Sequence, residues 1–475
     1  MGKKYYITGA IPYTNSRPHV GHALEFVQGD TIARYHKLLG EDVVLLSGGD
    51  ENALKNVQAA EKEGEPIQEF VDKNNKLFVE LTKNLNCDFD IWQKGSDQVN
   101  HFKSSQKLWE LCDKNGDIYQ KEYGGLYCVG CETFYTTDEL NSDGECFEHP
   151  GKKLEEVKEK NYFFKLSKYQ EKLIKLIESD TLKIFPQERK NEVLSFLKEP
   201  LQDISISRSN ERAKNWGVPV PNDNSQKIYV WFDALNIYQS GIGFGWDEEK
   251  YNKYWPADLH VIGKGISRFH AVYWPAFLLS ANLKLPKSLF IHGYFTVNGQ
   301  KMSKTLGNVI DPNEMIKKYG ADALRYYFLA KFSPFADGDF SEEKLRDVYN
   351  SDLANGLGNL VSRVARLCET SKFDFTSKET RLYPEAIKAI EEFRFDNALK
   401  FIWEKVTLVD QEINKNEPWK LEGEALKKEL QKYIVEIAEI ALNLKPFLPE
   451  TTEKIAKVFG GIKIKMTEPL FPRLK

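Results

Sequence analysis

The sequence is poor in cysteine, in long apolar runs and in net charge. Six cysteines among 475 residues are too few for the disulfide framework of a secreted protein, and no stretch approaches the roughly 18 apolar residues that span a membrane. The first residues lack a cleavable export signal. A formal net charge of −4 excludes wholesale binding of nucleic acid by charge, although Lys and Arg can still cluster locally. We therefore expect a cytoplasmic protein without membrane contact.

The chain does contain an alternation of short apolar runs and amphipathic segments. The runs KYYITGA and EDVVLLSGG are each followed by a loop and a helical pattern, and the alternation returns after residue 225. Between them, residues 116–225 are rich in Tyr, Thr and Gly and hold three clustered cysteines. After about residue 320, apolar residues recur three and four positions apart. This predicts an α/β fold, in which an insertion splits a Rossmann-like parallel-sheet domain and a helical bundle follows.

Two histidines mark the first transition from strand to helix. His19 and His22, in AIPYTNSRPHVGH, are three residues apart, so both rings lie on the same side of the first helical turn. A helix N-terminus offers free N–H groups and the positive end of a dipole, and Gly21 leaves room for a close approach. Together these residues form a cradle for a phosphate group. The motif H-x-G-H alone is weak, because such pairs also occur on surfaces and in cores.

A second basic motif occurs late in the α/β region. Lys301 and Lys304, in NGQKMSKTLGN, lie between Gly299 and Gly307. Two ammonium groups on a mobile loop suit a leaving pyrophosphate, whose charge develops only as the bond breaks. Alone, such a segment is more often a solvated basic turn. Together, H-x-G-H and K-M-S-K-[ST] resemble the double signature of the class I aminoacyl-tRNA synthetases, here with Thr305 in place of the commoner Ser.

Further stretches make the chain resemble the methionyl-tRNA synthetases in particular. Those that match over nearly the full length are AIPYTNSRPHVGH, YVWFDA, GKGISRFHAVYWPA, HGYFTVNGQKMSK, GADALRYYF and NEPW. Residues 116–225 are too few for the editing insertion of the isoleucine, valine and leucine enzymes. The resemblance implies activation of L-methionine by ATP, with Mg²⁺ accompanying the ATP, and transfer to tRNA(Met). Two alternatives stay open: a catalytically silent tRNA-binding paralogue, and a class I synthetase for another small apolar amino acid.

The resemblance also implies site residues at particular positions. The catalytic groups are His19, His22, Lys301 and Lys304, and the ATP site adds Gly21, Gly263 and Ser303. The methionine pocket comprises Ala10, Tyr13, Asp50, Trp231, Ala234, Tyr238, Ile266 and His270. In this pocket Asp50 binds the substrate ammonium, and a thioether suits an aromatic, mostly apolar slot. Three positions depart from the family's usual pattern, since Asn52 replaces a histidine of D-E-H-G, Leu235 a proline and Gly265 an acidic residue.

The clustered cysteines have the spacing of a zinc site. Cys128 and Cys131 are separated by two residues, and Cys146 and His149 repeat that spacing after a link of 14 residues. Four ligands with none left over predict one closed, structural Zn²⁺ site, a zinc knuckle, and the family resemblance implies the same. The alternative is a set of reduced free cysteines beside a chance histidine.

The helical region carries the residues that the resemblance assigns to the anticodon. These are Asn359, Arg363, Pro418 and Trp419. Arg and Asn can hydrogen-bond unstacked base edges and Trp can stack on a base, although Trp419 by itself fits bundle packing better. The expected parts are the catalytic domain at 1–115 and 226–310, the knuckle insertion at 116–225, a stem-contact link at 311–350 and the anticodon-binding bundle at 351–475. No tail domain follows the bundle, so we expect a monomer.

Overall fold

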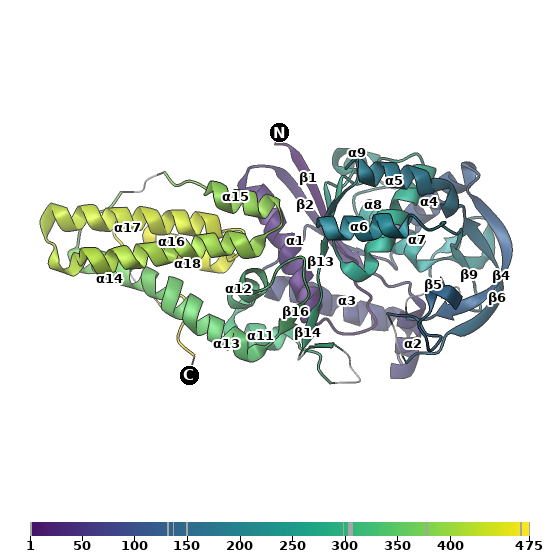
Figure 1. The fold of residues 1–475 in the computed structure, drawn as a ribbon, viewed down its shortest axis with the longest axis horizontal. Coiled ribbons are helices and arrows are strands. Elements are labelled where there is room, and N and C mark those ends of the chain that lie inside the picture. The colour runs from purple at the N-terminus through teal and green to yellow at the C-terminus, as the bar shows by residue number, and fades with distance from the viewer. Residues whose placement is uncertain are drawn as a thin grey trace. The chain divides into compact units, whose positions relative to one another are not determined.

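The computed structural model, drawn in Figure 1, describes residues 2–130, 133–135, 137–148, 151–297, 299–302, 307–376, 379–465 and 468–474. Its internal contacts divide the chain into two compact units. The first unit comprises Met1–Pro18, Glu41–Glu80 and Phe89–His292. The second comprises His19–Gly40, Leu81–Asp88 and Gly293–Lys475. Each unit is therefore assembled from segments that are far apart in the sequence.

A parallel sheet of six strands forms the centre of the first unit. Its order is β3–β2–β1–β12–β13–β7, and every neighbouring pair is parallel. The strands are β1 (Lys4–Gly9), β2 (Asp42–Gly49), β3 (Ile91–Lys94), β7 (Lys183–Phe185), β12 (Leu259–Gly263) and β13 (Ser288–His292). β1, β2 and β12 are buried over most of their length, which explains why their sequences are continuous apolar runs. The predicted α/β fold with a parallel sheet is confirmed.

Helices and two small sheets complete the first unit. The helices are α2 (Leu54–Glu63), α4 (His101–Lys114), α5 (Gln170–Glu178), α6 (Gln187–Phe196), α7 (Val230–Leu235), α8 (Ile237–Ser240), α9 (Glu248–Tyr254) and α10 (Trp274–Ser280), while α3 (Ile67–Asn84) continues into the second unit. One small sheet contains β4 (Ile118–Cys128), β5 (Thr133–Tyr135), β6 (Glu155–Phe164) and β8 (Ile204–Ser205). The other contains β9 (Ser207–Ser209), β10 (Pro219–Val220) and β11 (Asp223–Ile228).

The region predicted as one insertion, residues 116–225, differs from that expectation in one respect. β7 lies within this range, yet it pairs with β13 as the edge strand of the central sheet. A strand of three residues is too short to show a period in the sequence, so the pattern gave no sign of it. The two small antiparallel sheets do come from this range, apart from the last residues of β11.

Aromatic packing joins three helices of the first unit. The ring of Phe232, on α7, lies 5.6 Å from that of Trp109 on α4 and 4.6 Å from that of Phe277 on α10. All three side chains are buried in one core cluster. Edge-to-face and tilted arrangements at these distances are favourable beyond the area they bury. This core fixes α7 against α4 and α10.

The second unit consists mainly of helices. They are α1 (Val20–Leu38), α11 (Pro312–Tyr319), α12 (Ala321–Lys331), α13 (Glu342–Val348), α14 (Asn359–Ser371), α15 (Pro384–Glu391), α16 (Phe395–Asn416), α17 (Gly423–Leu444) and α18 (Pro449–Phe459). A small sheet adds β14 (Phe295–Val297), β15 (Gln300–Lys301) and β16 (Gly338–Phe340). Long helices α16 and α17 pack side by side, as Figure 1 shows, and give the predicted bundle. No described helix is apolar and long enough to cross a membrane.

A buried ion pair ties α1 to the rest of the second unit. The guanidinium of Arg325, on α12, lies 2.7 Å from the carboxylate of Asp30 on α1, and both side chains are almost fully buried. The same guanidinium donates to the carbonyl oxygens of Leu85, Pro446 and Phe447. A buried pair with its remaining hydrogen bonds satisfied is strongly destabilised when one partner is removed. Arg325 therefore holds α1 to α12, to the residues after α3 and to the turn before α18.

Candidate active site

The two histidines form the first turn of α1. His19 is the N-cap residue, and its Nδ1 accepts a hydrogen bond from the backbone N–H of Gly21 at 3.1 Å. The backbone N–H of His19 donates in turn to Nδ1 of His22 at 3.2 Å, which completes a reciprocal capping box. The ring centroids are 3.9 Å apart. The sequence prediction that both rings lie on one side of the turn is confirmed.

Burial sets the protonation of the two rings, and the capping bonds set which nitrogen carries the proton. Burial lowers the pKa of His19 to about 4, and burial together with the neighbouring His19 lowers the pKa of His22 well below its ordinary value. Both rings are therefore neutral at pH 7. Because each Nδ1 accepts a bond from a backbone N–H, each ring carries its proton on Nε2. The turn thus presents two neutral N–H donors.

Gly21 is needed for a reason that the sequence did not indicate. A Cβ at this position would lie 2.9 Å from Cε1 of His19, closer than side-chain atoms pack, and 3.5 Å from Cε of Met302. The glycine therefore makes room for the His19 ring itself and for contact with the lysine segment. The sequence predicted room for an approaching phosphate, whereas the group found against Gly21 is the His19 ring of the protein itself.

Met302 of the lysine segment (residues 298–308) and Ile310, two residues after that segment, lie beside this turn within the second unit. Met302 lies at Gly21, and the backbone N–H of Val20 donates to the carbonyl of Ile310 at 3.2 Å. Lys301 pairs with Thr296 in the ladder of β14 and β15. Ser303 and Lys304 lie outside the described residues, as does Thr305. Two motifs some 280 positions apart in the sequence therefore flank one place in the fold.

The eight predicted methionine-pocket residues belong to the first unit, and five of them follow the carboxyl ends of strands of its central sheet. Ala10 follows β1, and its carbonyl accepts a bond from Ser47 Oγ at 2.8 Å. Asp50 follows β2, is buried and forms a β-bridge with Tyr13. Asn56 Nδ2 donates to the Asp50 carbonyl at 2.8 Å, which fixes this loop. In open parallel α/β sheets, ligands bind beyond the carboxyl ends of the strands, where these residues lie.

An aromatic wall stands beside this loop. Trp231, on α7, lies edge-on to Tyr13 with ring centroids 6.2 Å apart and stacks on Phe269 at 3.6 Å. Ala234, one helical turn after Trp231, is buried and adds a small apolar side chain. Tyr13 thereby links the loop that holds Asp50 to the aromatic wall. Phe269 contributes to the wall although the sequence gave no sign of it.

Tyr238 and His270, both predicted for the methionine pocket, form a hydrogen-bonded pair. His270 Nδ1 lies 2.9 Å from the carbonyl of Ile266, so Nδ1 donates and Nε2 must accept. Tyr238 O–H therefore donates to His270 Nε2, at 2.7 Å. Burial lowers the pKa of His270 to about 4, against the opposing effect of its bond to Ile266, and keeps the ring neutral.

Gly263, which is predicted to contact ATP, ends β12 and precedes the short 3₁₀ turn Lys264–Ile266.

The predicted anticodon residues lie on two neighbouring elements of the bundle. Asn359 begins α14 and is exposed, and Arg363 lies one turn later. The Arg363 guanidinium lies 5.2 Å from the ring of Trp419 and bonds Asp410 and Asn414 at 3.1 and 2.7 Å. Trp419 is 51% exposed, so it is not a bundle-core residue. It follows the buried Pro418, another predicted anticodon residue, in the short 3₁₀ helix Pro418–Lys420.

Two of the four predicted zinc ligands are described and lie together. Cys128 and Cys146 are buried, reduced and 3.2 Å apart between their sulfur atoms. Thiolates that share one tetrahedral zinc ion are about 3.8 Å apart, so these two sulfur atoms need to separate only slightly to bind a common ion. Cys131 and His149 lie outside the described residues. Among the described ranges, no group of three or more candidate metal ligands occurs.

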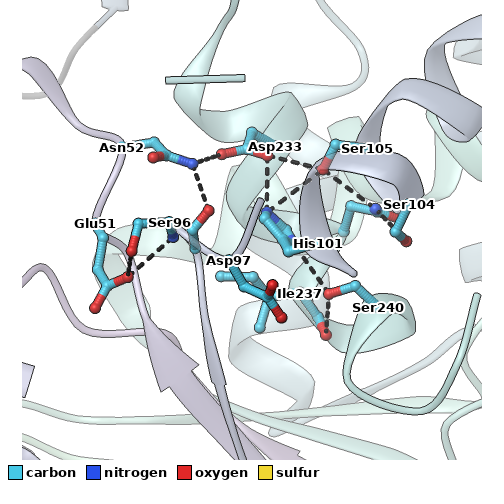
Figure 2. Close-up of polar contacts among 12 residues, drawn as sticks. Glu51, Asn52, Ser96, Asp97, His101, Ser104, Ser105, Asp233, Ile237 and Ser240 are labelled. Atoms are coloured by element: carbon cyan, nitrogen blue, oxygen red, sulfur yellow. Dashed lines mark hydrogen bonds and ion pairs between the residues drawn. The ribbon is translucent and has the colours of Figure 1, made fainter. Parts of the chain in front are cut away.

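Figure 2 shows a buried polar network that the sequence did not reveal. Asp233, on α7, accepts hydrogen bonds from His101, Ser105 and Asn52. His101 begins α4 and is separated from Asp233 by 132 positions. A contact between residues so far apart leaves no local pattern in a single sequence. Asn52, where the family commonly has histidine, is one of the three donors.

Comparisons with known proteins place this fold and site in one family. A family model described as "tRNA synthetases class I (M)" matches residues 5–365. The methionine–tRNA ligase of Thermotoga maritima is 42% identical over 472 residues, which cover 95% of this chain and 74% of that protein. That of Brucella suis is 39% identical over 509 residues, 99% of this chain and 98% of that protein.

A solved structure agrees with these sequence matches. The crystal structure of Mycobacterium tuberculosis methionyl-tRNA synthetase bound by methionyl-adenylate has a TM-score of 0.92 to this structure at 34% identity. The match covers 99% of this chain and 100% of that chain. The chain therefore belongs to the class I aminoacyl-tRNA synthetases and, within that class, to the methionyl-tRNA synthetase family.

The histidine turn predicts the effect of adding one methyl group. Gly21→Ala places a Cβ against the His19 ring, so the ring must shift and its Nε2–H no longer points as before. We expect ATP–pyrophosphate exchange to slow by about 100-fold, because small misplacements of reacting groups cost that much. Gly356→Ala is the control, since its Cβ meets only ordinary contacts. Equal exchange rates for the two variants would contradict this role of Gly21.

Proposed function

We propose that this protein is a methionine–tRNA ligase, which activates L-methionine with ATP and transfers it to tRNA(Met). The observation that carries the proposal is that Met302 of the lysine segment and Ile310, two residues after that segment, both lie beside the histidine turn. Membership of the methionyl-tRNA synthetase family supports the choice of amino acid. The site residues, the zinc ion and the domain boundaries given above are parts of the same proposal.

The first step needs no nucleophile from the protein. A carboxylate oxygen of methionine attacks the α-phosphorus of ATP, the bond to the β-phosphate oxygen breaks, and methionyl-adenylate and pyrophosphate result. The Nε2–H groups of His19 and His22 donate to phosphate oxygens, and Lys301 and Lys304 stabilise the charge that develops on pyrophosphate. Mg²⁺ enters with ATP as part of the substrate and neutralises phosphate charge. Positioning and charge stabilisation thus account for catalysis.

Methionine is held by its two ends. The carboxylate of Asp50 pairs with the substrate ammonium, and the thioether lies against Trp231, Ala234 and Tyr238. His270 is neutral and receives the Tyr238 hydroxyl proton in a hydrogen bond, so the pocket offers the sulfur atom no full charge. An uncharged, aromatic slot with one carboxylate at its mouth suits a zwitterion with a soft apolar side chain.

The second step transfers the methionyl group to tRNA. A hydroxyl of the terminal adenosine, the 2′ one first in class I, attacks the acyl carbon and releases AMP. We assign recognition of the CAU anticodon to Asn359, Arg363, Pro418 and Trp419. The exposed indole of Trp419 offers a stacking plane for an unstacked base, with the Arg363 guanidinium beside it. We expect a cytoplasmic monomer whose affinity for tRNA falls with salt.

We further propose one structural zinc ion in the insertion. Cys128 and Cys146 supply two of its ligands, and Cys131 and His149 supply the others. A thiolate-bound zinc with four protein ligands has no open position, so its role is to hold the segment around Cys146 against the end of β4. It takes no part in the reaction at the phosphates.

The substrate is tested by ATP–pyrophosphate exchange with each amino acid in turn. We expect exchange with methionine, and a Lys304→Ala variant that slows it by about 100- to 1,000-fold with little change in methionine affinity. The control is Lys317→Ala, an exposed cation of α11. Exchange with another amino acid would identify a different class I synthetase. No exchange with any amino acid would identify a catalytically silent paralogue. Near-normal exchange in Lys304→Ala would refute the role of that lysine.

The anticodon assignment predicts a selective effect on tRNA. Trp419→Ala removes a stacking plane worth about 1–3 kcal/mol per base, so the KM for tRNA should rise roughly 5- to 150-fold. Methionine-dependent exchange should stay unchanged. Leu408→Ala, which truncates another exposed side chain of the bundle, serves as the matched control. A loss of exchange in Trp419→Ala would show that the residue is structural.

The zinc assignment predicts a change in metal content. Cys128→Ser removes one thiolate, so the purified protein should lose the zinc that the wild type holds at one ion per chain. Metal analysis by mass spectrometry measures this directly. Cys368→Ser, in a buried thiol of α14, controls for the loss of any cysteine. Full zinc content in Cys128→Ser, or none in the wild type, would contradict the site.

A further inference from the structure

The polar network in Figure 2 joins the parts of the methionine pocket to one another. Asp233 is only 1% exposed, and His101 is fully buried. Neither residue is among the groups assigned to methionine, ATP, zinc or tRNA. A buried carboxylate destabilises the folded protein unless its oxygens are hydrogen-bonded. The partners of Asp233 therefore need to be identified.

Three donors satisfy the Asp233 carboxylate. Its Oδ1 accepts from His101 Nε2–H and from the Ser105 hydroxyl, both at 2.8 Å. Its Oδ2 accepts from Asn52 Nδ2 at 2.6 Å. The same Asn52 amide also donates to the carbonyl of Gly95 at 2.8 Å. The carboxylate is thereby fixed in orientation from two sides.

The bond between Asn52 and Asp233 connects the two ends of the pocket directly. Asn52 is two residues after Asp50, the carboxylate assigned to the substrate ammonium. Asp233 is on the six-residue helix α7, two residues after Trp231. One hydrogen bond of 2.6 Å therefore separates the loop that holds the ammonium end from the helix that holds the side-chain end.

His101 connects α7 to the next helix of the pocket. While its Nε2 bonds Asp233 on α7, its Nδ1 lies 2.8 Å from the hydroxyl of Ser240 on α8. Tyr238 lies on that same helix, two residues before Ser240. The rigid imidazole, with a nitrogen on each of two sides, thus spaces the helices that carry Trp231 and Tyr238.

We propose that His101 and Asp233 are positioning residues that set the length of amino-acid side chain the pocket accepts. The inference rests on the proposed function, because it takes the pocket to bind methionine. Asp50 binds the ammonium end of the substrate, and Trp231 and Tyr238 contact its side chain. The distance between the Asp50 loop and the two helices that carry these rings therefore decides which side-chain length fits. Neither positioning residue touches the phosphates, so their effect should fall on the amino acid alone.

Three variants of His101 separate positioning from general stability. His101→Ala removes the hydrogen bonds to Asp233 on α7 and to Ser240 on α8. His101→Gln places an amide where Nε2 was and keeps the bond to Asp233. His101→Asn places one where Nδ1 was and keeps the bond to Ser240. Kinetics of ATP–pyrophosphate exchange are measured with methionine, with its longer analogue ethionine and with the shorter norvaline. Lys103→Ala, an exposed residue of α4, is the control.

We expect His101→Ala to raise the KM for methionine about tenfold, since one buried hydrogen bond to a charged group is worth that much. Its preference for methionine over ethionine should fall by a similar factor, and the KM for ATP should stay within about twofold. His101→Gln should restore most of the preference, because it keeps the link to Asp233. Where His101→Ala does not fold, Asn52→Ala replaces it with the same expectation.

Two results would overturn the inference. One is an equal rise in the KM for methionine and for ATP, which marks a general loss of structure. The other is an unchanged preference for methionine over both analogues in a folded variant that lacks the link to Asp233. Failure of the proposed function is distinguishable, because the wild type would then exchange with an amino acid other than methionine or with none.

Discussion

A single guanidinium organises the second unit. Arg325 is completely buried, and its charge is balanced by Asp30 on α1 and by carbonyl groups from two other parts of the chain. Removing either partner of such a pair typically costs about 3–5 kcal/mol, because a buried charge is left alone. The histidine turn at the start of α1 depends on this anchor. A capping box can aim two imidazoles only if the helix behind them is held in place, and the Arg325 contacts hold it.

In the first unit, too, buried contacts hold the candidate site residues in place, but the groups that make those contacts are different. Its parallel sheet brings Ala10 and Asp50 to one edge, and short helices supply Trp231 and Tyr238 next to them. None of these residues is chemically unusual, so in the pocket proposed above selectivity would come from their arrangement. The network around Asp233 and the aromatic stack of α7 fix that arrangement from behind. A site without a protein nucleophile depends on such preorganisation, because binding and orientation are all that it contributes to the reaction.

The sequence revealed the parts whose signals are local. Buried parallel strands appear as continuous apolar runs, and histidines spaced three apart at a strand–helix junction predict two rings on one side of a helical turn, as the structure has them. Signals that depend on distant pairs were invisible, as for His101 and Asp233. The reason for Gly21 was also hidden, because only coordinates show that the His19 ring occupies the space of its missing side chain. Trp419 is the opposite case, since the residue taken alone fitted bundle packing better, and the structure places it at the surface.

The tautomers at the start of α1 bear on how the product departs. Each imidazole is uncharged and offers only one N–H, so its attraction for a phosphate oxygen is that of a dipole and not of an ion. Such a dipole stabilises the negative charge that develops on the phosphate oxygens while the bond to pyrophosphate breaks. It forms no ion pair that has to be broken afterwards. In the proposed mechanism only Lys301 and Lys304 form ion pairs with pyrophosphate, so the two rings add none that would slow its release, and the adenylate stays in the site for transfer to tRNA.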